Sequence, residues 1–293
     1  MKKVFILAVT LVWISAAQLS WAELLVFGPQ IYTRGPGQPE KIVKTFSVKN
    51  PSQKFTLSVQ SVEREPGKIS SAVIEVNGVQ VVGPKEFDKR AIHITKPVKV
   101  RKQNKIAVEV RSEPGTWVGV SILGPNRPSA KGIVGPQGGT VHLKGFASVI
   151  FPAGAFKAST PVTVSVTTSP ETAEDFNATA EGPRLPYEIR VNSGNIASAT
   201  SFDVVLDVPD SFIASLPPDT PQIEIFAQIL EDEGAEESLH HFHRFPSTFD
   251  AVTKKVNTTL PTYAFTNRRQ LDLTYDAIIT GGAIPKIERS KGR

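Results

Sequence analysis

The sequence predicts an all-β protein with two consecutive antiparallel β-sandwich domains after a cleaved signal peptide. Apolar and polar residues alternate over many short segments, and Pro and Gly turn signals separate these segments. Val, Ile and Thr are abundant, and no window longer than about ten residues shows helical spacing. The chain has no Cys, so its stability must come from buried apolar surface, which favours a bacterial source for an exported protein.

Residues 1–22 are predicted to be a signal peptide. Two lysines precede the apolar run 4–12, and the small residues Ser20 and Ala22 stand at positions −3 and −1 of a cleavage site. A membrane anchor is the alternative, but the run is shorter than the roughly 20 residues that a span needs. We therefore expect an exported chain that begins at Glu23, is periplasmic or extracellular, and has no transmembrane segment after cleavage.

The charge distribution indicates a domain boundary. Residues 23–131 hold 18 Lys and Arg against 9 Asp and Glu, whereas residues 132–293 hold 13 against 19. The sign changes at a Pro- and Gly-rich stretch typical of linkers. The predicted organisation is a signal peptide at 1–22, an Ig-like or jelly-roll sandwich at 23–123, a linker at 124–131, a second sandwich at 132–282 and a basic tail at 283–293.

The first domain is predicted to be a sandwich of about seven strands. Alternating patterns mark strands at 55–59, 106–110 and 118–122. Asn77-Gly78 lies between two apolar runs and predicts a two-residue type I′ hairpin, and Asn104 is expected to close a further turn. The order of these segments resembles the accessory Ig-like or jelly-roll sandwiches of bacterial exported proteins, including sugar-binding jelly rolls.

A basic segment in the first domain is a candidate site for an anionic polymer such as an envelope glycan, because clustered cations concentrate polyanions. The alternative is a solvated face in which lysines protect an edge strand from aggregation. Nucleic acid is not expected as a partner, because no aromatic residues are interleaved with the cations. The candidate residues are Lys85, Lys89, Arg90, Lys96, Lys99, Arg101, Lys102 and Lys105.

The second domain opens with a motif that suggests a family. Gly138-Gly139 predicts a tight turn, and residues 149–155 follow the pattern Val-x-Phe-Pro-x-Gly-Ala, with a strand expected at 162–166. This arrangement resembles the β domain shared by ankyrins, zonula occludens proteins and netrin receptors, as found in bacterial surface proteins. The resemblance implies a protein-interaction module and no chemistry. Further strands are expected at 187–191, 202–208, 223–229, 254–260 and 271–279.

His241 and His243 are a candidate metal site. On a strand both side chains would point to the same face, and imidazole is a good ligand for transition metals. A closed site needs three or four ligands, however, so the alternative is a solvated hairpin that follows the acidic loop 231–237.

No catalytic signature is found in the sequence, so we predict that the protein is not an enzyme and needs no cofactor. It has no Cys nucleophile, no Gly-x-Ser-x-Gly motif and no His-Glu-x-x-His helix. The favoured function is an interaction or spacer module of the bacterial envelope, in adhesion or surface assembly, with an envelope protein or glycan as partner. The alternative is carbohydrate or polyanion binding by the first domain, for which Trp117, Phe87 and Tyr32 are the obvious aromatic side chains.

Overall fold

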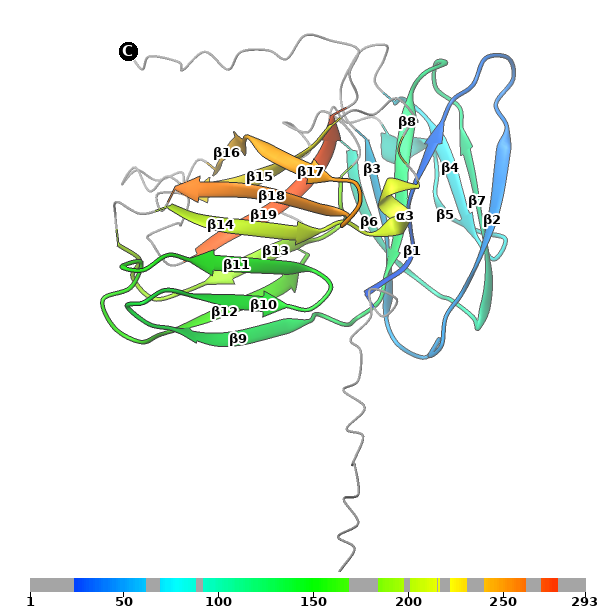
Figure 1. Cartoon of the computed structure of the whole chain (residues 1–293). Coiled ribbons are helices and arrows are strands. Elements are labelled where there is room, and N and C mark those ends of the chain that lie inside the picture. The colour runs from blue at the N-terminus through cyan, green and yellow to red at the C-terminus, as the bar shows by residue number, and fades with distance from the viewer. Residues whose placement is uncertain are drawn as a thin grey trace, which may run out of the picture.

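The structure, a computed structural model, confirms the all-β class (Figure 1). The described strands form four antiparallel sheets around two apolar cores, so that two sandwiches follow one another along the chain. No helix among the described residues is long and apolar enough to cross a membrane. The structure describes residues 24–61, 69–87, 92–168, 184–197, 201–214, 216, 222–230, 240–261 and 270–278.

In its described part, the first sandwich has eight strands in two four-stranded sheets. From one edge to the other, one sheet contains β1 (Leu25–Thr33), β8 (Trp117–Leu123), β3 (Phe55–Ser61) and β6 (Ile92–Val98), and the other contains β2 (Lys41–Ser47), β7 (Gln103–Val110), β4 (Ala72–Val76) and β5 (Val79–Val82). The first strand pairs with the eighth, the second with the seventh, the third with the sixth and the fourth with the fifth. A single long hairpin rolled into two layers gives this order, which is that of a jelly roll and not of an Ig fold.

The strands predicted from alternation are those that build the core of the first sandwich. Leu57 of β3, Ile106 of β7 and Val120 of β8 are fully buried, as the period of two requires. The predicted hairpin is also present, because Asn77 and Gly78 have φ angles of 54° and 81°. A short 3₁₀ helix, η1 (Pro84–Phe87), follows β5.

The strands that the sequence did not reveal are at edges or are interrupted. β2 buries only Phe46, so its pattern lacks alternation. β6 is an edge strand that contains Pro97, and β1 has register shifts around Gly28. These departures explain why about seven strands were expected where eight are found.

As far as the structure describes it, the second sandwich packs a five-stranded sheet against a six-stranded sheet. The first contains β10 (Gly139–Leu143), β11 (Ala147–Phe151), β14 (Ser201–Asp207), β18 (Lys255–Pro261) and β17 (Ser247–Asp250). The second contains β16 (His240–Phe245), β15 (Gln222–Leu230), β19 (Gln270–Ile278), β13 (Glu188–Asn192), β12 (Thr160–Thr167) and β9 (Ser129–Val134). A one-turn helix, α3 (Asp210–Ile213), follows β14. All strands expected from the sequence in this part of the chain are confirmed to within one or two residues.

The glycine pair and the Phe-Pro motif of the second sandwich contact each other. Gly138 has φ of +84°, and a Cβ at this position would lie 2.5 Å from the carbonyl oxygen of Phe151. The amide of Gly154 donates to the carbonyl oxygen of Pro136 at 2.8 Å. The two segments of the motif therefore stabilise one turn through direct contact. The need for glycine at position 138 follows from this close packing and its positive φ, without a bound ligand.

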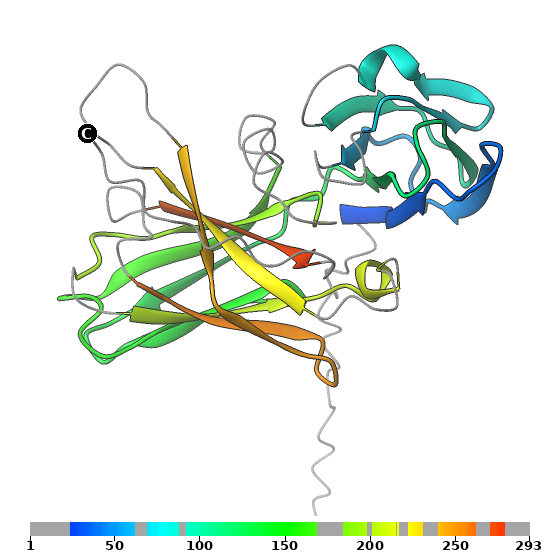
Figure 2. The ribbon, with the colours of Figure 1, turned by 90° about the horizontal axis from the view of Figure 1, so that it is seen from above.

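The two sandwiches contact each other through the β1–β8–β3–β6 sheet, which faces the second sandwich (Figures 1 and 2). Polar side chains on the outer face of this sheet are buried: Ser58 and Ser121 are 2% exposed, and Gln60 is 4% exposed. The Gln60 amide donates to the carbonyl oxygen of Arg184, and Arg184 Nε donates to Gln60 Oε1 at 3.3 Å. Buried polar groups need such partners, so these bonds fix how the two sandwiches meet.

The chain between the sandwiches is bound along most of its length. The amide of Gly124 donates to the carbonyl oxygen of Leu24 at 2.7 Å, and the carbonyl oxygen of Pro128 accepts from Val166 at 2.9 Å. Ser129–Lys131, which the sequence placed in the linker, are the first residues of β9. Leu24, Leu25 and Leu123 pack with the core of the second sandwich.

Candidate functional site

The β6–β7 turn presents the predicted cations to solvent. Lys99, Arg101 and Lys102 are exposed in the turn, and Lys105 is exposed on β7. Asn104 is buried and closes the turn as expected: its Oδ1 accepts from the amide of Arg101, and its Nδ2 donates to the carbonyl oxygen of Arg101, both at 2.7 Å.

Two further lysines, which sequence reasoning missed, lie beside this turn. Lys49 and Lys54 are exposed in the β2–β3 connection. The amide of Val48 donates to the carbonyl oxygen of Lys102 at 2.9 Å, and Phe55 pairs with Val98, so the two turns are adjacent. Only the pairing of the strands brings these lysines close to the turn, and that pairing cannot be read from the local sequence. We call Lys49, Lys54, Lys99, Arg101, Lys102 and Lys105 the basic end; among the described residues no ion pair involves these side chains.

The remaining predicted cations lie apart from the basic end or outside the described residues. Lys85 is exposed in η1. Lys96 is on the edge strand β6, where its Nζ lies 3.6 Å from Glu86 Oε1. That placement fits the protection of a sheet edge by a charged side chain. Lys89 and Arg90 lie outside the described residues.

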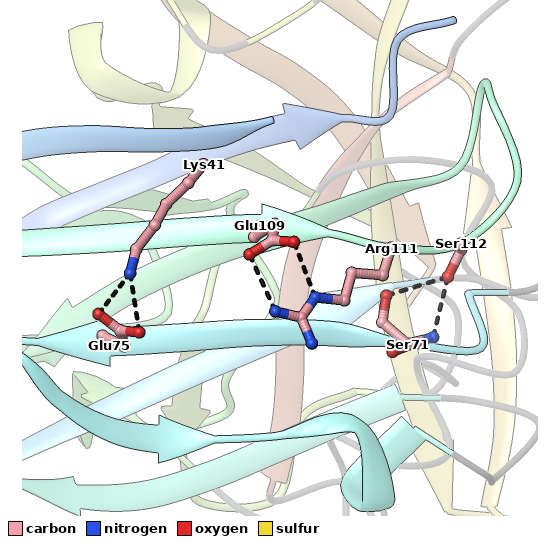
Figure 3. Close-up of polar contacts among 6 residues, drawn as sticks. All are labelled: Lys41, Ser71, Glu75, Glu109, Arg111 and Ser112. Atoms are coloured by element: carbon pink, nitrogen blue, oxygen red, sulfur yellow. Dashed lines mark hydrogen bonds and ion pairs between the residues drawn. The ribbon is translucent and has the colours of Figure 1, made fainter. Parts of the chain in front are cut away.

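Charged residues on the outer face of the β2–β7–β4–β5 sheet are paired with each other (Figure 3). Lys41 Nζ lies 2.8 Å from the Glu75 carboxylate, and Arg111 donates two hydrogen bonds to the Glu109 carboxylate at 2.8 and 3.0 Å. The bond from Arg111 lowers the pKa of Glu109, and Glu109 in turn raises the pKa of Arg111. The first pair joins β2 to β4 across β7, and the second lies at the end of β7, so the cations of both pairs are already engaged.

A serine closes the same sheet near these ion pairs (Figure 3). Ser112 Oγ accepts hydrogen bonds from the amides of Ser70 and Ser71 at 2.8 and 2.9 Å. It lies 3.1 Å from the carbonyl oxygen of Ser71, to which it donates. The hydroxyl of Ser112 is therefore occupied in holding the chain that leads into β4, and it is not placed as a nucleophile.

A cavity of ≈ 140 Å³ lies at the end of the first sandwich opposite the basic end. The loop that connects β1 to β2 forms its rim, with Arg34, Gln38 and Glu40, and Tyr32, Val108 and Val110 line it from the strands. The Tyr32 hydroxyl and Arg34 Nε are buried, and neither has a hydrogen-bond partner among the described residues. Burial raises the pKa of the Tyr32 hydroxyl, which therefore stays protonated.

The aromatic side chains considered for sugar stacking do not form an exposed platform. Phe87 is fully buried in the core, Tyr32 is 2% exposed, and Trp117 is half-buried. These three side chains therefore give no open aromatic face in the described part of the first sandwich.

The two candidate histidines lie on the edge strand β16 and are two positions apart. His241 pairs with Ile229 of β15, and His243 pairs with Ala227. Their side chains lie outside the described part of the structure. Within the described part, no group of three His, Asp or Glu side chains is placed to hold a metal ion.

A third histidine lies where the two sandwiches meet. His93 is on the outer face of β6, and its Nε2 lies 3.3 Å from Ser58 Oγ. Burial and, to a smaller extent, the positive charge of Arg184 lower the pKa of His93 to about 4. The imidazole is therefore neutral at physiological pH.

Comparison with protein-family models gives no match, and comparison with curated proteins gives none either.

Proposed function

We propose that the protein is an exported, non-catalytic protein of the bacterial envelope whose two sandwiches form one rigid interaction or spacer module. One observation carries the proposal: the outer face of the β1–β8–β3–β6 sheet is polar yet buried where the sandwiches meet, and Gln60 and Arg184 exchange two hydrogen bonds there. Two independent domains on a free linker would leave that face in water. A fixed distance between two outer surfaces is what a spacer needs.

Distance measurements between spin labels test the rigidity. The chain has no cysteine, so Val43→Cys and Val252→Cys, at positions 56% and 91% exposed, give one clean label on each sandwich. We expect one narrow distance distribution. The control pair is Val43→Cys with Val79→Cys, both exposed on the first sandwich, which gives the width for a single rigid body. A much broader distribution for the first pair would refute the rigid module.

Cell fractionation tests the location. We expect the protein in the envelope fraction of its source cells, with a mass that corresponds to a chain beginning at Glu23. Recovery in the cytosol with residues 1–22 intact would refute export.

A second candidate function is the binding of an anionic polymer, and the basic end favours it. Its cations lie together in and beside adjacent turns, without a described acidic partner. By contrast, Lys41 and Arg111, which lie away from the basic end, are paired with Glu75 and Glu109. Unpaired surface cations raise the local concentration of a polyanion, and salt screens the effect.

Matched charge variants test this candidate with polyphosphate as the probe. Replacing Lys99, Arg101 and Lys102 by Gln should weaken binding at low salt by about tenfold. A tenfold change in Kd corresponds to about 1.4 kcal/mol of binding free energy, which is shared here by three contacts. Replacing Lys41, Lys44 and Arg111 by Gln removes the same charge elsewhere on the sandwich and should change binding far less. Equal losses in the two variants would show an effect of net charge alone, without a site.

A further inference from the structure

We propose that the cavity at the β1–β2 loop binds a single neutral sugar unit or a polyol of similar size. The cavity lies at the other end of the first sandwich from the basic end, so the proposal does not rest on the proposed function. Its volume of ≈ 140 Å³ is enough for several water molecules or one small ring, and not for a folded polymer.

Two buried donors in the cavity lack partners. Tyr32 is 2% exposed and Arg34 is 9% exposed, and neither the Tyr32 hydroxyl nor Arg34 Nε is hydrogen-bonded to any part of the chain that the structure describes. An unsatisfied buried donor destabilises a fold by about 1–3 kcal/mol, and more than 90% of such groups have partners. Two of them on one small cavity indicate a bound molecule that supplies acceptor oxygens.

The arginine is held in place before any ligand arrives. Its terminal nitrogens donate to the carbonyl oxygens of Gly35 and Gly37. Its own amide donates to the carbonyl oxygen of Thr116 at 2.7 Å, and its carbonyl oxygen accepts from Gly115 at 2.8 Å. With the backbone and both ends of the guanidinium fixed, Arg34 Nε cannot turn to another partner. Preorganisation of this kind lowers the entropic cost of binding.

The other groups on the cavity select the class of ligand. Gln38 and Glu40 add acceptors for hydroxyl hydrogens, and the charge of Glu40 balances that of Arg34. Ile42, Val108 and Val110 give the cavity an apolar side. A ligand must therefore accept from two donors, donate to a carboxylate or amide, carry no net charge and show a C–H face. Neighbouring hydroxyl groups on a sugar ring meet all four requirements.

The test uses the chain from Glu23 to Arg293 with isotope-labelled valine methyl groups. Glucose, galactose, mannose, N-acetylglucosamine and glycerol are titrated, with glucuronate and acetate as acidic probes. We expect at least one neutral sugar to shift the methyl resonances of Val108 and Val110 without shifting those of Val149 in the second sandwich. No shift with any neutral probe, or tighter binding of an acidic probe, would overturn the proposal.

A conservative variant separates binding from folding. Tyr32→Phe removes only the hydroxyl, so affinity for the sugar should fall by about five- to tenfold, the effect of one lost hydrogen bond. The melting temperature without sugar should not fall, because the hydroxyl has no hydrogen-bond partner among the residues that the structure describes. Tyr187→Phe, a buried tyrosine of the second sandwich, is the control and should leave affinity unchanged. Unchanged affinity in Tyr32→Phe would overturn the assignment of the site.

Discussion

Acidification should weaken the contact between the two sandwiches through His93. The pKa of this histidine is about 4 in the folded protein, against its usual value of 6.5. Because the folded pKa is lower, the unfolded chain binds more protons between these two values, and stability falls as the pH decreases through that window. The contribution is complete above about pH 6.5 and is lost progressively toward about pH 4.

The magnitude follows from the two pKa values. Each unit of difference corresponds to about 1.36 kcal/mol, so the full effect is about 3 kcal/mol, and about 2 kcal/mol of it is lost between about pH 7.5 and about pH 5. The cost is electrostatic and local: a charged imidazole would be buried beside Ser58 and near the guanidinium of Arg184.

Urea unfolding followed by tryptophan fluorescence measures this effect. Trp117 is the single tryptophan after residue 22, so its emission reports on the first sandwich. The free energy of unfolding is compared at about pH 7.5 and about pH 5 in the wild type and in His93→Gln, which cannot titrate. The wild type should lose about 2 kcal/mol more than the variant. Equal losses, or a His93 resonance that titrates near its usual value, would refute the reasoning.

Three further changes have defined outcomes. Leu57→Ala, at a fully buried position of β3, should lower the free energy of unfolding by about 2–5 kcal/mol, as measured by tryptophan fluorescence; a smaller loss would mean that the core collapses around the gap. Gly138→Ala should lower the melting temperature in calorimetry more than Gly154→Ala, because both have positive φ but only the former places its Cβ 2.5 Å from a backbone oxygen. Asp272→Asn should lower the free energy of unfolding by about 1–3 kcal/mol, as measured by urea unfolding followed by circular dichroism. The substitution weakens two hydrogen bonds from Arg190, at 2.7 and 3.0 Å, to a carboxylate that is only 6% exposed. An unchanged midpoint would show that the pair is not stabilising.

Local patterns were sufficient for the central strands of the fold. Residues 55–59 and 118–122 alternate because one face of each strand lies in the apolar core, whereas the other face carries small or polar residues and lies where the two sandwiches meet. Asn77-Gly78 adopts the positive φ angles that few other dipeptides allow. The edge strands β2 and β6 were not predicted, because a strand with few buried side chains does not alternate between apolar and polar residues. The jelly-roll order depends on which strands pair across long stretches of sequence, and no local pattern records that.

The candidate sites were predictable only where they are local. The cations of the β6–β7 turn are close in sequence, so their clustering was visible. Lys49 and Lys54 reach the same end only through the strand register. The cavity joins Tyr32 and Arg34 to Val108 and Val110, which are far apart in the chain, and Arg34 carried no signal beyond its Pro- and Gly-rich neighbours.

The nested hairpin of the first sandwich has a consequence for how the protein assembles. Loop closure favours the shortest connection, so we expect β4 and β5 to pair first and β1 and β8 last, since these lie farthest apart in the sequence. The final pair also carries Leu24, Leu25 and Leu123 into the core of the second sandwich. The closing of the jelly roll and its packing against the second sandwich are thus one step. A chain that stopped before this step would expose these three leucines, and the part of the second core that they cover, to water.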